Sequence, residues 1–411
     1  MFRIVIAALL VLIGAALPAR AAESAYAAQD SQPQETAAFA RLLEKLKQHP
    51  EIRSYASRTE SSRDYAEGEL GLPDPVLFME QQNYPIGSST SQMLEMKSIG
   101  FRQEIPAFGT RGAKSEKIQA EAHKSRLAQA YAFAAMKAKL IAVLAAWRSI
   151  REQEKLLDEQ AGLFSFERTS LKGRIAANQT GVSRLSMSQA DSTEVQLRRA
   201  DLEEKKHGVM DMLANMVGET LYVGPPPVKL AAWDNDPDKT YPVKIAAEDI
   251  TMARKEVDMR DAEFGPHFEV QAGYGRMNNG DNAGTVMVGL SIPLWASESQ
   301  RPKLNGAKAA LHSSELDQDA VKRDTIEKLN YLKAQIDISA QKIELLETKD
   351  TDLATAARAL AREYEAGKAD MAMILKTRRD ALSVRISLAQ EQAKRIALIA
   401  DFNHYIIGDA L

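Results

Sequence analysis

The chemically versatile side chains of this chain are scattered rather than grouped. No two of its six histidines are four residues apart, the spacing that places two imidazoles on one face of a helix. There is also no His-Glu-x-x-His motif, no Walker loop and no nucleophile elbow. The sequence therefore predicts no catalytic residues, no metal site and no cofactor, and we expect the chain not to be an enzyme. The histidines are His49, His123, His207, His267, His312 and His404.

Carboxylates and thioethers offer two further kinds of chemistry. The carboxylates alternate with lysines, as in residues 201–206, which is typical of a solvated helix face. Among the fifteen methionines, Met371 and Met373 lie near a predicted turn and could act as soft ligands for copper or silver. Methionine more often fills space between side chains, and we favour that interpretation. Because the chain has no cysteine, disulfides, thiolate metal sites and lipidation of an amino-terminal cysteine are excluded.

The first residues predict export. Arg3 precedes an apolar stretch that reaches Leu17, and Ala19 and Ala21 supply the small residues that a signal peptidase recognises. We expect residues 1–21 to be a cleaved signal peptide, with a retained anchor as the alternative. Cleavage would remove Arg3 and Arg20 and move the formal net charge from −3 to −5, which leaves no basic surface for nucleic acid. No later stretch is expected to form a membrane helix, so a membrane-embedded part would have to be a β-barrel.

Two long tracts without proline, residues 107–224 and 303–411, are rich in good helix formers. Apolar residues recur in them every seven positions, a spacing that keeps one face of a helix against a partner. The first series is Val143, Ile150, Leu157, Phe164 and Leu171; the second tract carries Leu329, Ile336 and Ile343, and then Leu346, Leu353 and Leu360. We predict a long helix of about 100 Å at 113–178 and another at 302–365.

Each long helix is expected to end in a turn and to return as a shorter helix. Gly181 and Gly367 mark the turns, since glycine commonly ends a helix in the left-handed conformation. The return helices are predicted at 184–217 and 370–407, with Ser183 or Asp370 available as caps.

Two pairs of strands precede these helical hairpins. Residues 267–276 and 285–294 alternate apolar and polar side chains around a polar loop, which predicts a β-hairpin. Its apolar face is formed by Phe268, Val270, Tyr274, Val286, Val288, Leu290 and Ile292. A weaker copy is expected at 76–84 and 93–105, where Gln103 interrupts the apolar face.

The two halves of the chain repeat one another. Ile105-Pro106 recurs as Ile292-Pro293, and Gly181 recurs as Gly367 at almost the same offset along the sequence. With entry helices at 41–70 and 243–264, we predict repeats at 22–221 and 243–411, joined by a linker at 222–242. The fold class is mainly α with a small β part. Because a barrel needs about eight strands, several copies must share one barrel.

These residues resemble the TolC-like outer-membrane efflux family. The resemblance rests on Leu72-Pro73-Asp74-Pro75, on Gln103-Glu104-Ile105-Pro106 with Arg111-Gly112, on residues 288–294, and on His49-Pro50-Glu51-Ile52. It implies a homotrimer in the outer membrane of a Gram-negative cell, with twelve pooled strands and a periplasmic helical tunnel. It further implies docking onto a periplasmic adaptor served by an inner-membrane pump of the RND type, and the motif at Leu72 is most similar to the heavy-metal, Czc/Cus-type branch.

The resemblance also assigns the two turns to adaptor docking and gating. The residues concerned are Gly181, Val182, Ser183, Arg184 and Leu185 in the first turn, and Gly367, Lys368, Ala369, Asp370 and Met371 in the second. Some relatives carry acidic rings after the second turn, whereas here Asp370 is the only acid nearby. An ion pair between Arg184 and Asp370 is therefore a hypothesis for the gate, with two solvated charges as the alternative.

Other functions stay open at this stage. The same channel could serve type I protein secretion beside an ABC exporter. A periplasmic adaptor would need one helical hairpin within a lipoyl-like domain, but two hairpins are predicted here. A non-membrane coiled-coil protein would leave the alternating strands at 267–294 without a role.

Overall fold

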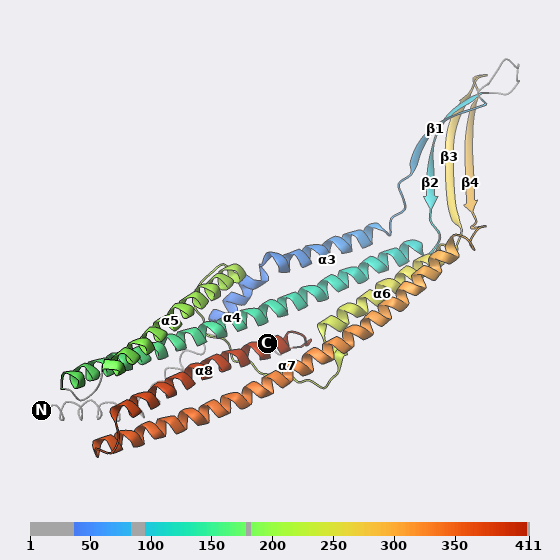
Figure 1. The fold of residues 1–411 in the computed structure, drawn as a ribbon. Coiled ribbons are helices and arrows are strands. Elements are labelled where there is room, and N and C mark those ends of the chain that lie inside the picture. Colours follow the sequence, from blue (N-terminus) through green and yellow to red (C-terminus); the bar gives the residue numbers. More distant parts are fainter. Residues whose placement is uncertain (1–36, 84–94, 178–181, 409–411) are drawn as a thin grey trace. The chain divides into compact units, whose positions relative to one another are not determined.

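The computed structural model describes residues 37–83, 95–177 and 182–408, and Figure 1 shows their helices and strands. The predicted signal peptide at 1–21 lies outside the described residues. One element order occurs twice along the chain: an entry helix, two strands, a long helix and a return helix. The fold is thus mainly helical with a small antiparallel sheet, as the sequence predicts.

The elements have the following bounds. The first set is α3 (Pro50–Gly68), β1 (Val76–Gln82), β2 (Met96–Ile105), α4 (Thr110–Ala176) and α5 (Val182–Val217). After the short helix η1 (Pro237–Lys239), the second set is α6 (Tyr241–Ala262), β3 (His267–Met277), β4 (Asn282–Ser291), α7 (Gln300–Glu365) and α8 (Met371–Asn403).

The long helices and their return helices confirm the predicted hairpins to within a few residues. The entry helix predicted at 41–70 is wrong as a single element, because the chain forms one helix at 37–47 and a second, α3, that begins at Pro50. Proline has no backbone N–H to donate to a preceding turn, so it is tolerated at the start of a helix and ends the helix before it. The predicted cap Ser183 lies inside α5, whereas Asp370 caps α8 by accepting a bond from the amide of Ala372.

The chain divides into two compact units, and both predicted repeats contribute to each unit. The first unit contains residues 132–234, 327–408 and the described residues up to Ile52; the second contains 53–131 and 235–326. The two units do not coincide with the two repeats, so the repeat boundaries at 22–221 and 243–411 stay a prediction from the sequence.

In the first unit, the long helices and their return helices lie in a row in the order α5, α4, α8, α7 (Figure 1). Lys206 of α5 pairs with Glu154 of α4 at 2.8 Å. Gln390 of α8 donates to Gln153 of α4 at 2.8 Å. The side chain of Arg385 on α8 reaches Asp350 on α7 at 2.9 Å. Helices α5 and α7 therefore stand at the two ends of this row.

The predicted heptad series on α4 is the buried face of that helix. All five residues, Val143, Ile150, Leu157, Phe164 and Leu171, are buried. Three of them pack against Val195 and Leu202 of α5. Burial of such side chains contributes about 1.5–3 kcal/mol each, so this seam is a main source of stability for the helical hairpin.

Helix α4 also contains a stretch that is long and apolar enough to cross a membrane, judged by length and composition only. No later stretch was expected to form a membrane helix, and this one meets the length and composition criteria because the small alanines around 128–146 raise its average hydropathy beside a few charged residues. Leu140, Ile141 and Leu144 of this helix are fully buried in the core with Leu46 and Leu213. A core helix passes the same test, so one such stretch is weak evidence for a membrane span.

The second unit holds the sheet together with α3, α6 and the adjoining parts of α4 and α7. The buried hydroxyl of Ser115 on α4 donates to the carbonyl of Ala66 on α3 at 2.7 Å. Lys117 and Lys124 of α4 pair with Glu256 and Asp249 of α6 at 2.9 and 2.5 Å. Polar contacts thus fasten α4 to the entry helices on both sides.

Candidate functional site: the sheet faces and the helical tips

The four strands form one antiparallel sheet in the order β1-β2-β3-β4. The two predicted hairpins are joined by a ladder between β2 and β3, in which Met96 is opposite Met277 and Ile105 is opposite Phe268. This ladder was not predicted, because a hairpin is encoded by neighbouring residues, whereas the whole of α4 and α5 separates β2 from β3 along the sequence.

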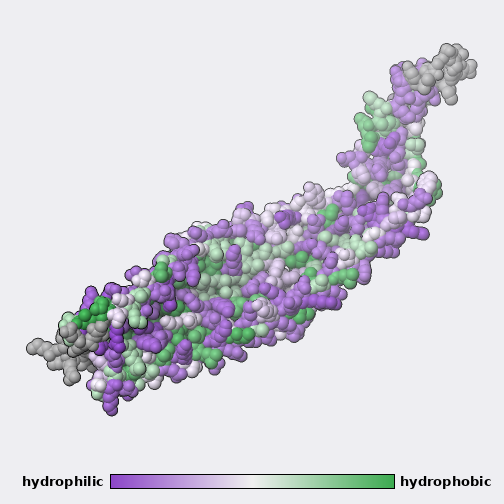
Figure 2. All heavy atoms as spheres, in the orientation of Figure 1, coloured by the Kyte–Doolittle hydropathy of each residue, from purple (hydrophilic) through white to green (hydrophobic). Residues whose placement is uncertain are grey.

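One face of the sheet is apolar and exposed. Directly opposed residues of an antiparallel pair lie on the same face, so the register places Leu77 beside Phe101, Ala272 and Val286. Met79, Ile99, Tyr274, Val288 and Leu290 belong to the same face by alternation. Leu77, Met79 and Val286 are 72%, 83% and 77% exposed. In the space-filling view, apolar residues reach the surface of the strands (Figure 2). We call these residues the apolar sheet face.

The opposite face is more polar and carries several glycines, beside the apolar side chains of Val76, Phe78 and Met287. It includes Ser98, Arg102, Glu269 and Gln271, with Arg102 and Glu269 forming an ion pair at 3.4 Å across β2 and β3. A Cβ at Gly100 would lie 2.4 Å from the carbonyl oxygen of Ala272, so the two strands approach closely only because glycine is present. A sheet that is apolar on one side and more polar on the other suits a boundary between lipid and water.

Six of the seven strand residues predicted for the apolar face occupy it: Phe268, Val270, Tyr274, Val286, Val288 and Leu290. Ile292 does not, because β4 ends at Ser291, although the side chain of Ile292 is exposed. The next residue, Pro293, has no amide to donate, so the ladder cannot continue through it. The strand predicted at 285–294 is accordingly shifted toward the amino terminus, to Asn282–Ser291.

Gln103 interrupts the apolar pattern of β2 because its side chain makes a hydrogen bond to the segment before β1. Its side-chain amide donates to the carbonyl of Pro73 at 2.7 Å. Arg111 donates similarly to the carbonyl of Leu70 at 2.8 Å. Both residues belong to the motifs that carry the family resemblance, and their side chains hold the segment that connects α3 with β1.

We call the ends of the two helical hairpins, where α4 turns into α5 and α7 turns into α8, the helical tips. The turn at the second tip, between α7 and α8, has the predicted geometry. Gly367 adopts a φ of 73°, and the amide of Lys368 donates to the carbonyl of Glu363 at 2.8 Å, closing the end of α7. Asp370 and Met371 then begin α8. Of the first turn, Gly181 lies outside the described residues, while Val182, Ser183, Arg184 and Leu185 form the first turn of α5.

The carboxylate of Asp370 lies near the guanidinium groups of two arginines. The guanidinium of Arg184 lies 3.6 Å from one carboxylate oxygen, and that of Arg174 lies 3.4 Å from the other. The pair proposed from the sequence is therefore within ion-pair distance, and the two tips lie at the same level. The side chains of Arg184 and Asp370 are about half exposed, so the pair contributes only about 0–1 kcal/mol to stability.

A less exposed contact lies further along the helices. Arg379 of α8 reaches Glu167 of α4 at 2.6 Å, with only 19% and 14% of the two side chains exposed. The guanidinium also lies 4.8 Å from the ring centre of Phe164, and Ser188 of α5 donates to Glu167 at 3.3 Å. Sequence reasoning missed this contact, because nothing in the local pattern distinguishes Arg379 from its neighbour Arg378.

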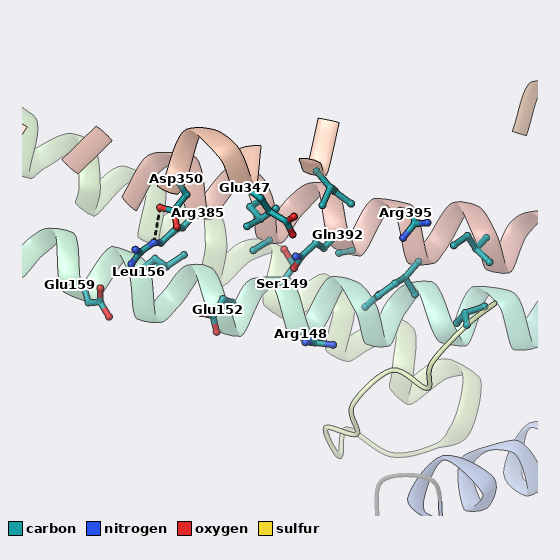
Figure 3. Close-up of a pocket in the computed structure, with 18 residues that line it drawn as sticks. Arg148, Ser149, Glu152, Leu156, Glu159, Glu347, Asp350, Arg385, Gln392 and Arg395 are labelled. Carbon is teal, nitrogen blue, oxygen red and sulfur yellow. Dashed lines mark hydrogen bonds and ion pairs between the residues drawn. The ribbon is translucent and has the colours of Figure 1, made fainter. Parts of the chain in front are cut away.

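A groove of about 860 Å³ in the first unit lies between α4, α7 and α8 (Figure 3). Its walls carry both carboxylates and arginines, and Arg385 and Asp350 pair across it. Among residues 37–83, 95–177 and 182–408, no three histidine, aspartate or glutamate side chains are grouped so that they could hold a metal ion. The groove therefore presents a charged surface without the ligand set of a metal centre.

Residues 242–399 match the family model described as outer membrane efflux protein. No curated protein matches the sequence.

Solved structures of outer membrane efflux proteins and related channels share the fold over most of the chain. The outer membrane protein VceC of Vibrio cholerae is 14% identical, with 90% of this chain and 95% of VceC covered at a TM-score of 0.74. CusC is 12% identical, with 89% of this chain and 91% of CusC covered at a TM-score of 0.75. The open state of the MtrE outer membrane channel of Neisseria gonorrhoeae is 14% identical, with 89% of this chain and 88% of MtrE covered at a TM-score of 0.70. At these identities the similarity establishes the fold, which is that of outer-membrane channels with helical barrels.

Proposed function

We propose that this protein is the outer-membrane subunit of a tripartite efflux system and that three copies form one passive channel. The observation that carries the proposal is the four-stranded sheet, which has one apolar exposed face and two edges, β1 and β4, that no strand of the described residues covers. Unpaired backbone groups cannot face lipid, so such a sheet is stable in a membrane only when its edges are paired.

Pairing between copies fits the direction of the strands. Since neighbours alternate in direction, β4 of one copy runs antiparallel to β1 of the next. Four strands are too few for a barrel, whereas three copies supply twelve, within the range known for barrels in outer membranes. Strands β2, β3 and β4 have 10, 11 and 10 residues, the length that a tilted strand needs to cross a bilayer.

The remaining parts of the proposal are supported by the resemblance to outer membrane efflux proteins. We propose that the helical tips contact a periplasmic adaptor coupled to an inner-membrane pump, and that Asp370 with Arg174 and Arg184 holds the periplasmic entrance closed. Metal ions or small toxic compounds are the proposed cargo; the resemblance of Leu72 to Pro75 to the heavy-metal branch supports this choice.

Deletion of the gene, with measurement of tolerance to metals and antibiotics, tests the function. We expect growth to become sensitive to at least one exported compound and to recover when the wild-type gene is supplied. Fractionation should place the protein in the outer membrane as an oligomer that dissociates on a denaturing gel only after heating. Unchanged tolerance to every compound together with a water-soluble monomer would refute the proposal.

A further inference from the structure

Helix α7 has a second apolar face that the described residues leave uncovered. Its buried residues, including Leu329, Leu332 and Ile336, pack against Ile399 and Phe402. Three large apolar side chains at seven-residue spacing lie elsewhere on the helix: Tyr331, Ile338 and Leu345, which are 59%, 52% and 68% exposed. At about 100° per residue, Ile338 points roughly 160° away from Ile336. A helix with apolar side chains on two such faces is expected between two neighbours in a curved wall.

The matching end of the helix row is α5, whose buried face contacts α4 through Val195 and Leu202. Two positions beyond each of these lie Leu197 and Glu204, both exposed and roughly 160° away from the buried face. Gly208 is exposed next to them and offers no side chain of its own. Apolar patches also interrupt the hydrophilic surface of the helices in Figure 2.

The two outer faces carry charges of opposite sign beside these apolar positions, with Asp352 as an acid where the α7 series continues toward the tip. Lys342 and Lys349 flank the apolar series of α7, and Asp201 and Glu204 lie on the outer side of α5. All four are exposed, and none of them has an ion-pair partner within the part of the chain that the structure describes. A second copy of this chain is therefore the occupant that the charges fit.

The distance of a residue from the helical tips predicts which residues of α5 and α7 lie side by side in neighbouring copies. Because Arg184 and Asp370 pair, the two hairpins of one chain end at the same level, and residues equally far from the tips lie side by side. The rule holds within the chain for Arg385 and Asp350, which form an ion pair. At about 1.5 Å per residue, Arg385 lies about 21 Å beyond the start of α8 at Met371, and Asp350 lies about 22 Å before the end of α7 at Glu365.

The same rule can be applied between copies related by an axis along the helices. Glu204 lies about 33 Å beyond the start of α5, and Lys342 lies about 35 Å before the end of α7. Gly208 and Ile338 lie about 39 Å and about 41 Å from the same two ends. The two members of each pair thus differ in level by only about 1.5 Å, the rise of a single residue.

We infer that the outer face of α7 binds α5 of the next copy, with Lys342 opposite Glu204 and Ile338 over Gly208. This inference rests on the proposed oligomeric channel and specifies its subunit contact on the helices. The glycine leaves room for the isoleucine side chain, and the ion pair fixes the register between the antiparallel helices.

Disulfide formation tests this contact directly, because the natural chain has no cysteine. The double variant Glu204→Cys with Lys342→Cys is made in the full-length protein, purified from the outer membrane and oxidised. Paired helices bring the two Cα atoms into the range of about 4.4–6.8 Å that a disulfide requires. We expect covalent oligomers up to the complete ring on a non-reducing denaturing gel.

Three controls separate the contact from chance encounters. Each single cysteine variant should remain monomeric on the gel. Glu204→Cys with Lys328→Cys should also remain monomeric, since Lys328 lies about 21 Å from Lys342 along α7. Before oxidation, every variant is checked for the heat-dissociable oligomer, so that a variant that fails to assemble is recognised.

The outcomes distinguish the contact from the function. Covalent oligomers in the 204/342 variant alone support the inference. A heat-dissociable oligomer in the outer membrane that does not cross-link at 204/342, or that links equally at 204/328, overturns the contact while the channel proposal stands. A water-soluble monomer contradicts the channel proposal itself.

Discussion

At the scale of single residues, the sites of interest are ion pairs and buried polar groups rather than catalytic side chains. Asp370 combines two tasks, because it caps α8 and accepts Arg174 and Arg184 from the other helical hairpin. Glu167 and Arg379 make a more enclosed link between the hairpins. The exposed contact is the weaker one, so it is the better candidate for a link that breaks when the entrance opens.

Neutralising Asp370 tests its role in the gate. In Asp370→Asn, Arg174 and Arg184 lose their shared carboxylate, so we expect a several-fold higher conductance per channel. The melting temperature should change little, because an exposed pair contributes only about 0–1 kcal/mol. Asp191→Asn is the matched control, since Asp191 is also exposed near the tip and has no ion-pair partner among the described residues. Equal conductance in both variants and the wild type would remove Asp370 from the gate.

The imidazole of His404 predicts a pH dependence of stability. Burial at the end of α8 lowers its pKa below the ordinary value of 6.5, although the charge of Asp401 opposes the shift. The folded protein therefore favours the neutral ring, and the unfolded chain takes up the proton first as the pH falls. This contribution to stability is intact above about pH 6.5 and is lost as the pH falls toward the folded-state pKa. We expect the melting temperature to fall between about pH 7.5 and about pH 5.5, and to fall less in His404→Gln. An identical fall in both proteins would show that other groups cause it.

At the scale of elements, the sheet is divided between an apolar and a polar face, and substitutions on the two faces should differ in effect. Val288 lies on the apolar sheet face, whereas Thr285 lies on the polar face of the same strand. Lysine on a lipid-exposed face costs about 2–4 kcal/mol near the middle of a bilayer. We expect Val288→Lys to lose most of the heat-dissociable oligomer and Thr285→Lys to retain it, measured on unheated gels. Equal tolerance of both lysines would mean that this face does not contact lipid.

Most elements could be predicted from the sequence because their signals are local. The seven-residue series on α4 predicted the buried face of that helix, and the glycine at position 367 predicted the turn between α7 and α8. What could not be predicted depends on residues far apart in the chain, such as the β2–β3 ladder and the contact between Glu167 and Arg379. The errors at Pro50 and Ile292 share a cause, since both predicted elements were extended across a proline that interrupts the backbone pattern.

At the scale of the whole molecule, two kinds of edge remain open among the residues that the structure describes. The sheet ends at β1 and β4, and the helix row ends at α5 and α7. Both need a neighbour, the first because lipid cannot satisfy backbone groups and the second because apolar side chains favour removal from water. In the proposed oligomer, a neighbouring copy supplies a partner of the same kind to each edge.

The central claim is that copies of this chain pool their strands into a membrane channel. The most direct measurement is the ionic current across a planar lipid bilayer to which the purified mature protein has been added from detergent. We expect discrete, uniform conductance steps from the wild type and none from Val288→Lys at the same protein concentration. A wild-type protein that leaves the bilayer without current, and that remains a monomer in solution without detergent, would contradict the claim.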